Sequence, residues 1–154
     1  MPLWIIYHPP SAFTSPETKR SLANEITKIY TGVGLPPFYV NVFFRPMEPA
    51  DCFVGGEERP SSEKPSFIRL TMEHIARTFP NKEAADKFMG RVDEVLKPYI
   101  ADQGFDWEYS ILETSRDLWK VNGLVPPMTG TKAEQMWFKE NKPLEFEKAD
   151  GGLA

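Results

Sequence analysis

A proline directly follows the first methionine, and this position could carry chemistry. Removal of Met1, which is usual before a small residue, would leave Pro2 as a free secondary amine. An α-amino group has an ordinary pKa of about 8, and nearby cations with partial burial would lower it further. Such an amine is neutral near pH 7 and can act as a base or a nucleophile. A proline at position 2 is common, however, and alone it does not establish a function.

Three basic side chains, Arg69, His74 and Arg77, lie within nine residues of one another, at and just after the end of an expected strand. Ligands bind beyond the carboxyl ends of parallel strands. A pair of arginines there could bind a carboxylate through charge-assisted hydrogen bonds. The alternative is that these side chains form surface ion pairs with Glu73 or Asp86.

Other ionisable side chains near expected strand ends are weaker candidates. Tyr30 lies on the first expected helix and Tyr109 on the fourth expected strand, while Glu113 and Asp117 follow that strand. Each is more often a core or surface residue than a site residue. Cys52 has no cysteine partner and no Cys/His cluster around it, so neither a disulfide nor a zinc site is expected.

The elements that must position these residues form two similar halves. Apolar runs and alternation predict strands over 3–7, 39–44, 66–72 and 107–112. Helical spacing and capping residues predict one helix between Thr14 and Gly32 and another between Asn81 and Gly104. We therefore expect a single domain over 1–154 with a first β-α-β unit (1–45), a loop (46–65), a second β-α-β unit (66–113) and a C-terminal segment (114–154).

Each β-α-β unit should have parallel strands and a right-handed crossover. Two such units side by side predict an α+β fold of α/β type, with a four-stranded, mainly parallel sheet and both helices on one face. The other face of the sheet would stay uncovered. Its apolar residues need a partner, which indicates an oligomer.

The overall composition excludes several classes of protein. The chain has 154 residues, 41% of them hydrophobic, which is enough for a core. A net charge of −4 gives no electrostatic basis for binding nucleic acid or an anionic membrane. The apolar run at the N-terminus is too short for a signal peptide, and no stretch approaches the ~20 residues of a membrane span. A cytoplasmic location is expected.

Several features together carry a resemblance to a known family. The chain resembles the cis-chloroacrylate dehalogenase-like branch of the tautomerase superfamily, and its fungal-type members in particular, up to about residue 130. The features are Pro2 ahead of an immediate strand, the doubled β-α-β pattern, Asn41-Val42, Phe53-Val54-Gly55-Gly56, His74-Ile75-Ala76-Arg77, Trp107-Glu108-Tyr109, and Leu118-Trp119-Lys120-Val121-Asn122-Gly123 before Pro126-Pro127.

The resemblance implies a homotrimer with no metal and no organic cofactor. Members of this family tautomerise enol acids, hydrate or dehalogenate unsaturated acids, or decarboxylate a small keto acid. The family's catalytic proline matches Pro2, one of its two carboxylate-binding arginines matches Arg77, and its water-activating tyrosine matches Tyr109.

The chain also departs from the family pattern. His74 stands where the family has its other arginine, and Tyr30 stands where it has a substrate-binding histidine. The water-activating glutamate aligns near Asp117 or Lys120, and Glu113 is a further candidate acid or base. These departures favour reactions that do not need an activated water.

Tautomerisation needs less than water addition does. It needs a neutral Pro2 to move a proton, and cations at Arg77 and His74 to hold the enolate charge. The sequence therefore predicts a tautomerase that acts on a small carboxylate-bearing substrate, with Arg69 and Tyr30 as further binding residues. The alternatives are a hydratase, dehalogenase or decarboxylase, a pathway-specific isomerase or lyase, and a non-catalytic trimeric binding protein.

Overall fold

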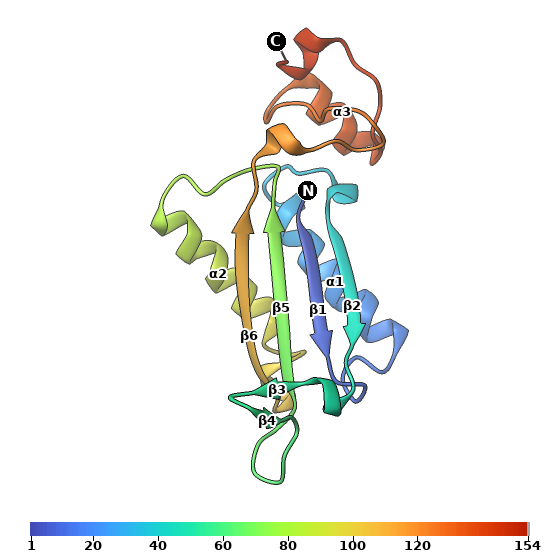
Figure 1. The fold of residues 1–154 in the computed structure, drawn as a ribbon. Helices are drawn as coiled ribbons and strands as arrows, with labels where there is room; N and C mark the ends of the chain where they lie inside the picture. Colours follow the sequence, from blue (N-terminus) through green and yellow to red (C-terminus); the bar gives the residue numbers. More distant parts are fainter. Residues whose placement is uncertain (154) are drawn as a thin grey trace.

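The computed structural model describes residues 1–153, and its centre is a four-stranded sheet (Figure 1). The strands are β1 (Leu3–His8), β2 (Asn41–Pro46), β5 (Phe67–His74) and β6 (Asp106–Glu113), in the order β2-β1-β5-β6. The pairs β1–β2 and β5–β6 are parallel, whereas the central pair β1–β5 is antiparallel. The predicted duplication of a β-α-β unit is therefore confirmed, with the two units running in opposite directions.

The antiparallel central pair determines which residues meet at each end of the sheet. Leu3 lies opposite Glu73, and Tyr7 lies opposite Arg69. The start of β1 therefore lies beside the end of β5, which brings Pro2 close to His74 although they are far apart in the sequence.

Helices α1 (Pro16–Thr31) and α2 (Lys82–Leu96) lie together behind the sheet in the view of Figure 1. The Ser15 side chain caps α1 by accepting a hydrogen bond from the Thr18 amide at 3.1 Å, so the cap is one residue later than Thr14, where it was expected. The Asn81 side chain caps α2 as predicted, accepting from the Ala84 amide at 2.9 Å.

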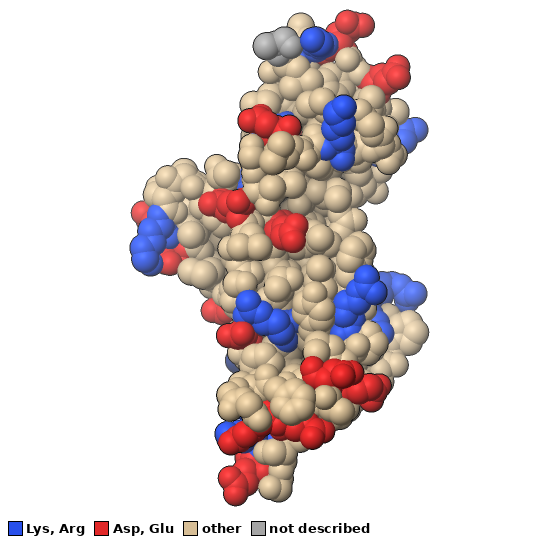
Figure 2. Space-filling view, viewed as in Figure 1, with Lys and Arg blue, Asp and Glu red and all other residues tan. Residues whose placement is uncertain are grey.

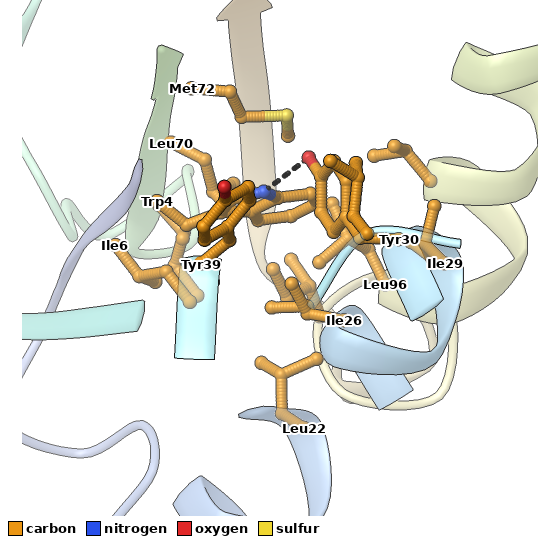
Figure 3. Close-up of a cluster of buried hydrophobic side chains, with 14 of the residues drawn as sticks. Trp4, Ile6, Leu22, Ile26, Ile29, Tyr30, Tyr39, Leu70, Met72 and Leu96 are labelled. Atoms are coloured by element: carbon orange, nitrogen blue, oxygen red, sulfur yellow. Dashed lines mark hydrogen bonds between the residues drawn. The ribbon is translucent and has the colours of Figure 1, made fainter. Parts of the chain in front are cut away.

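Alternating residues of the central strands point toward the helices and form the core (Figure 3). The large side chains that are less than 2% exposed come from the sheet, from α1 and α2 and the segments that follow them, and from the C-terminal segment: Trp4, Ile6, Leu22, Ile26, Tyr39, Ile68, Leu70, Met72, Val92, Leu96, Ile100 and Trp137. One polar contact crosses this core, from the Trp4 indole to the Tyr30 hydroxyl (Figure 3).

The opposite face of the sheet is not covered by helices. It carries the alternate residues, including Leu3 and Ile5, and leaves Phe43 46% and Leu112 58% exposed. Figure 2 shows this face, on which several charged side chains are surrounded by uncharged ones. The face also carries charged side chains such as Arg69 and Glu108. Exposed apolar residues of this kind are normally covered by another chain, as the sequence analysis expected.

The region 46–65 was predicted to be a loop, and it contains a short hairpin of β3 (Phe53–Val54) and β4 (Glu57–Glu58). Acidic side chains gather around this hairpin at the bottom of the view in Figure 2. Within residues 1–153 there are also five short 3-10 helices: Pro37–Tyr39, Pro49–Asp51, Ala101–Gln103, Arg116–Leu118 and Lys148–Gly151.

The C-terminal segment contains a helix that the sequence analysis did not anticipate, α3 (Lys132–Glu140). It lies beyond the end of the sheet where the N-terminus emerges (Figure 1). Trp137 of α3 is fully buried, and its ring packs edge-on against Tyr39 at 6.1 Å between centroids. Within residues 1–153, no helix is long and apolar enough to cross a membrane.

Candidate active site

A cavity of about 360 Å³ opens at the end of the sheet where β1 begins and β5 ends. Its walls come from the start of β1, the end of α1, the segment after β5 and one side of α2. Four residues predicted from the sequence lie together in it: Pro2, Tyr30, His74 and Arg77. The other lining residues are Val33, Leu35, Ile75, Ala76, Thr78, Phe79, Ala84, Lys87, Phe88 and Arg91.

Pro2 is buried and held in place by the sheet. Its carbonyl oxygen accepts a hydrogen bond from the Asn41 amide at 2.9 Å, and β1 begins with the next residue. With Met1 attached, the Pro2 nitrogen is an amide and has no basicity. The terminal ammonium of Met1 has a pKa lowered to about 4, because it is buried and because the charge of Arg116 is nearby. This end of the sheet therefore disfavours a protonated amine.

Tyr30 links β1 and β5 through two hydrogen bonds. Its hydroxyl oxygen accepts from Trp4 Nε1 at 2.7 Å and lies 2.8 Å from His74 Nε2. Burial is the main reason why the pKa of His74 is lowered to about 4, and the charge of the N-terminus adds to this effect. The imidazole is therefore neutral at pH 7, and the expected positive charge on His74 is wrong for this chain. A neutral Nε2 without a proton accepts a hydrogen bond from the Tyr30 hydroxyl.

Arg77 is committed to partners in its own chain. Its Nη2 lies 3.4 Å from Oε2 of Glu134, and its Nη1 donates to the Val33 carbonyl. Glu134 is 5% exposed and also accepts a hydrogen bond from the Gly130 amide at 2.7 Å. The Nε–H of Arg77 is buried and has no acceptor among residues 1–153. Arg77 therefore keeps one free donor while its charge is largely compensated.

Glu134 is a site residue that the sequence analysis missed. The signal was present, because Thr131 and Glu134 have the Ser/Thr-x-x-Glu spacing of a helix start. Thr131 does cap α3, and its hydroxyl accepts from the Glu134 amide at 3.3 Å. The spacing predicts a helix at this position, but it does not predict which cation the glutamate reaches.

Tyr109 and Glu113 do not line the Pro2 cavity within this chain. The Tyr109 hydroxyl donates to Asp93 Oδ1 at 2.9 Å, and Glu113 Oε1 accepts from the Phe79 amide at 2.6 Å. Both line a separate cavity of about 250 Å³. Phe79 lines both cavities and lies between the two groups of residues.

Arg69 and Asp117 also lie away from Pro2. Arg69 was expected at the carboxyl end of its strand, which is wrong because β5 continues to His74. Its side chain forms an ion pair with Glu108 at 2.8 Å on the uncovered sheet face. Asp117 is exposed and contacts Ser115. Among the residues that the structure describes, no three His, Cys, Asp or Glu side chains are placed to hold a metal ion.

Comparisons with known proteins give one family and several similar solved structures. A family model described as a putative oxalocrotonate tautomerase enzyme matches residues 1–142. Native RhCC from Rhodococcus jostii RHA1 is 39% identical, with a TM-score of 0.87 over 94% of this chain and 99% of that one. A probable enzyme from the thermophilic fungus Aspergillus fumigatus is 44% identical, with a TM-score of 0.86 over 95% of this chain and 98% of that one.

More distant structures share the fold alone. One is a wild-type fused 4-OT described as a symmetric trimer, which is 17% identical, with a TM-score of 0.62 over 80% of this chain and 94% of that one. No curated protein shows a significant match.

Proposed function

The chain belongs to the family of putative oxalocrotonate tautomerase enzymes, and we propose that it is a cofactor-independent tautomerase of small enol or keto acids. The observation that carries this proposal is that Pro2, from the start of β1, lines a largely apolar cavity together with Tyr30, His74 and Arg77. Loss of Met1 would convert the Pro2 nitrogen from an amide into a secondary amine facing bound substrate.

The amine of Pro2 is the proposed proton carrier. Burial lowers the pKa of the Met1 ammonium to about 4. The same burial would lower the pKa of a Pro2 ammonium, which lies at the same end of the sheet. The amine would therefore be neutral at pH 7. It takes the proton of an enol hydroxyl and returns a proton to the adjacent carbon, so the enol becomes a ketone with no net change in atoms or electrons.

Arg77 is the proposed donor to the developing enolate oxygen. The Arg77 side chain lines the cavity and is 30% exposed, so part of its guanidinium is open to a bound ligand. A donor in a water-poor site stabilises an oxyanion more than it would in water. The neutral His74, fixed by Tyr30, keeps this part of the cavity free of a second charge.

Water addition is less well supported by the same cavity. A hydratase or dehalogenase needs a base aimed at water, and no Asp or Glu is among the described residues that line the cavity. Glu113 binds the Phe79 amide, and Asp117 is exposed on the segment after β6.

Self-association is the second part of the proposal. The uncovered sheet face exposes Phe43 and Leu112, and the fused 4-OT of the same fold is described as a trimer. We infer a homotrimer that buries this face.

The test combines mass and activity on the untagged chain. The intact mass shows whether Met1 is absent, and ketonisation of phenylenolpyruvate is followed as a function of pH. We expect a mass without Met1 and a rate that rises through an apparent pKa below that of an ordinary proline amine. A chain that keeps Met1 and still converts the enol at full rate would refute the amine mechanism.

A further inference from the structure

The charges that line the cavity all have one sign. Arg77, Lys87 and Arg91 line it, and no Asp or Glu is among its described lining residues, although the whole chain has a net charge of −4. A concentration of positive charge in an otherwise acidic protein attracts anions into a cleft with low-dielectric walls. The cavity is therefore suited to an acid, and the three cations differ in how free they are to bind it.

Arg77 is the least available of the three cations. Glu134 lies 3.4 Å away and is 5% exposed, so the carboxylate of the chain itself already occupies one side of this guanidinium. Lys87 and Arg91 are exposed, and neither side chain makes a hydrogen bond or ion pair with any residue in the range 1–153. Two uncompensated cations thus remain for an incoming anion.

Lys87 and Arg91 are placed to act together. They are four residues apart on α2, so their side chains leave the same face of the helix, and both line the cavity. Both guanidinium groups lie close to glycines at the end of α1. If Gly32 carried a Cβ atom, that atom would lie 4.0 Å from Nη2 of Arg91, and a Cβ atom on Gly34 would lie 3.9 Å from Nη2 of Arg77. The two guanidinium groups therefore flank the turn that ends α1.

The surface between these cations and Pro2 is mostly apolar. Val33, Leu35, Ile75, Phe79 and Phe88 line it, and Val33 is 48% exposed. A volume of about 360 Å³ falls within the range of pockets that hold drug-sized ligands, which begins at roughly 300 Å³. A ligand that fills the cavity therefore needs an apolar body of aromatic size in addition to its acid group.

We propose that Lys87 and Arg91 bind the acid group of the substrate at the mouth of the cavity. The apolar body of the substrate would then pack against the apolar lining residues Val33, Ile75 and Phe79. This inference rests on the proposed function and specifies its substrate class. In this arrangement Lys87 and Arg91 of α2 recognise the acid group, and Arg77 contacts the reacting oxygen.

The test measures binding, so that it does not depend on turnover. The dissociation constants of cinnamate and of its neutral amide, cinnamamide, are determined by calorimetry for the wild-type chain and for the double variant Lys87→Met/Arg91→Met. The matched control is Lys82→Met/Lys97→Met. It removes two cations that belong to the same helix region but are paired with Asp86 and Asp102 and do not line the cavity.

We expect the Lys87/Arg91 variant to bind cinnamate at least ten times more weakly and cinnamamide as the wild type does. The control should change both constants by less than twofold. Unchanged cinnamate binding in the Lys87/Arg91 variant would overturn the proposal, and so would an equal loss in the control, which would indicate only a long-range charge effect. Repeating the measurement in Pro2→Ala separates this inference from the amine mechanism, since acid binding must survive even where turnover does not.

Discussion

The Tyr30 hydroxyl lies 2.8 Å from Nε2 of His74, and the same oxygen accepts a hydrogen bond from the Trp4 indole at 2.7 Å. The contact joins α1 to both central strands at the inner end of the cavity. The resemblance to the dehalogenase-like branch implied a substrate-binding histidine at position 30 and an arginine at position 74. In this chain Tyr30 and His74 instead form a hydrogen bond with each other, and both are neutral at pH 7. The inner wall of the cavity is therefore polar but uncharged.

Removing the Tyr30 hydroxyl should cost stability. Tyr30→Phe leaves Trp4 Nε1 and His74 Nε2 buried without a partner, and each unsatisfied group costs roughly 1–3 kcal/mol. We expect a loss of about 2–4 kcal/mol in the free energy of unfolding, measured by urea denaturation. Tyr99→Phe is the matched control, because its hydroxyl contacts Ser21 at an exposed site and should change stability by less than about 0.5 kcal/mol. Equal effects of the two variants would contradict the buried network.

Stability should fall between neutral and mildly acidic pH because of His74. Its pKa is lowered from 6.5 to about 4, mainly by burial, so the unfolded chain binds a proton in this window that the folded chain does not. The stabilising effect is complete above pH 6.5 and is lost as pH falls toward 4.

This effect should amount to about 2 kcal/mol between pH 7 and pH 5. The measurement compares the free energy of unfolding at both pH values in the wild type and in His74→Gln. The Gln variant keeps an acceptor for Tyr30 and does not titrate, so it should lose about 2 kcal/mol less. An identical pH dependence in both chains would refute the low pKa.

Arg77 and Glu134 should be energetically coupled. Removing Arg77 leaves the buried Glu134 carboxylate, which is 5% exposed, without its cation, and this costs stability. Arg77 itself is partly exposed to solvent, which weakens its attraction to Glu134. In a double-mutant cycle of Arg77→Met and Glu134→Gln, we expect a coupling energy of about 1–2 kcal/mol from thermal or urea unfolding. Additive effects within ~0.5 kcal/mol would show that the two side chains act independently.

Replacing Pro2 should affect the reaction far more than the fold. Pro2→Ala replaces a secondary amine by a primary one and removes a small buried ring, while the carbonyl that accepts from Asn41 remains. We expect kcat for phenylenolpyruvate to fall by about 10²-fold or more, with only a small change in the midpoint of thermal unfolding. Pro10→Ala, in an exposed turn, serves as the control and should leave kcat unchanged. Comparable losses of kcat and stability in Pro2→Ala would contradict the catalytic role.

The sequence predicted the elements well where local chemistry determines them. The Asn81 cap and the alternation from Ile68 to Met72 were enough to place α2 and β5. The observed boundaries differ from the predicted ones where pairing with a neighbouring strand extends an element. Strand β5 was expected to end at Met72, but it pairs with β6 as far as His74. This shift explains the error on Arg69, because two further strand residues move the carboxyl edge of the sheet away from it.

The composition of the site was harder to predict. Pro2 and His74 meet only because β1 and β5 are antiparallel, and the two β-α-β patterns do not determine that orientation. The charge state of His74 depends on burial, which no local pattern records. The contact between Arg77 and Glu134 joins residues 57 positions apart, through a helix whose capping signal was overlooked.

The duplication has a consequence for stoichiometry. The two β-α-β units of one chain are similar in layout, yet β1 directly follows Pro2, while β5 begins at Phe67 inside the polypeptide. A terminal amine can therefore arise once per chain, never twice. Under the proposed mechanism, a reagent that alkylates the Pro2 amine should inactivate the protein at one equivalent per polypeptide.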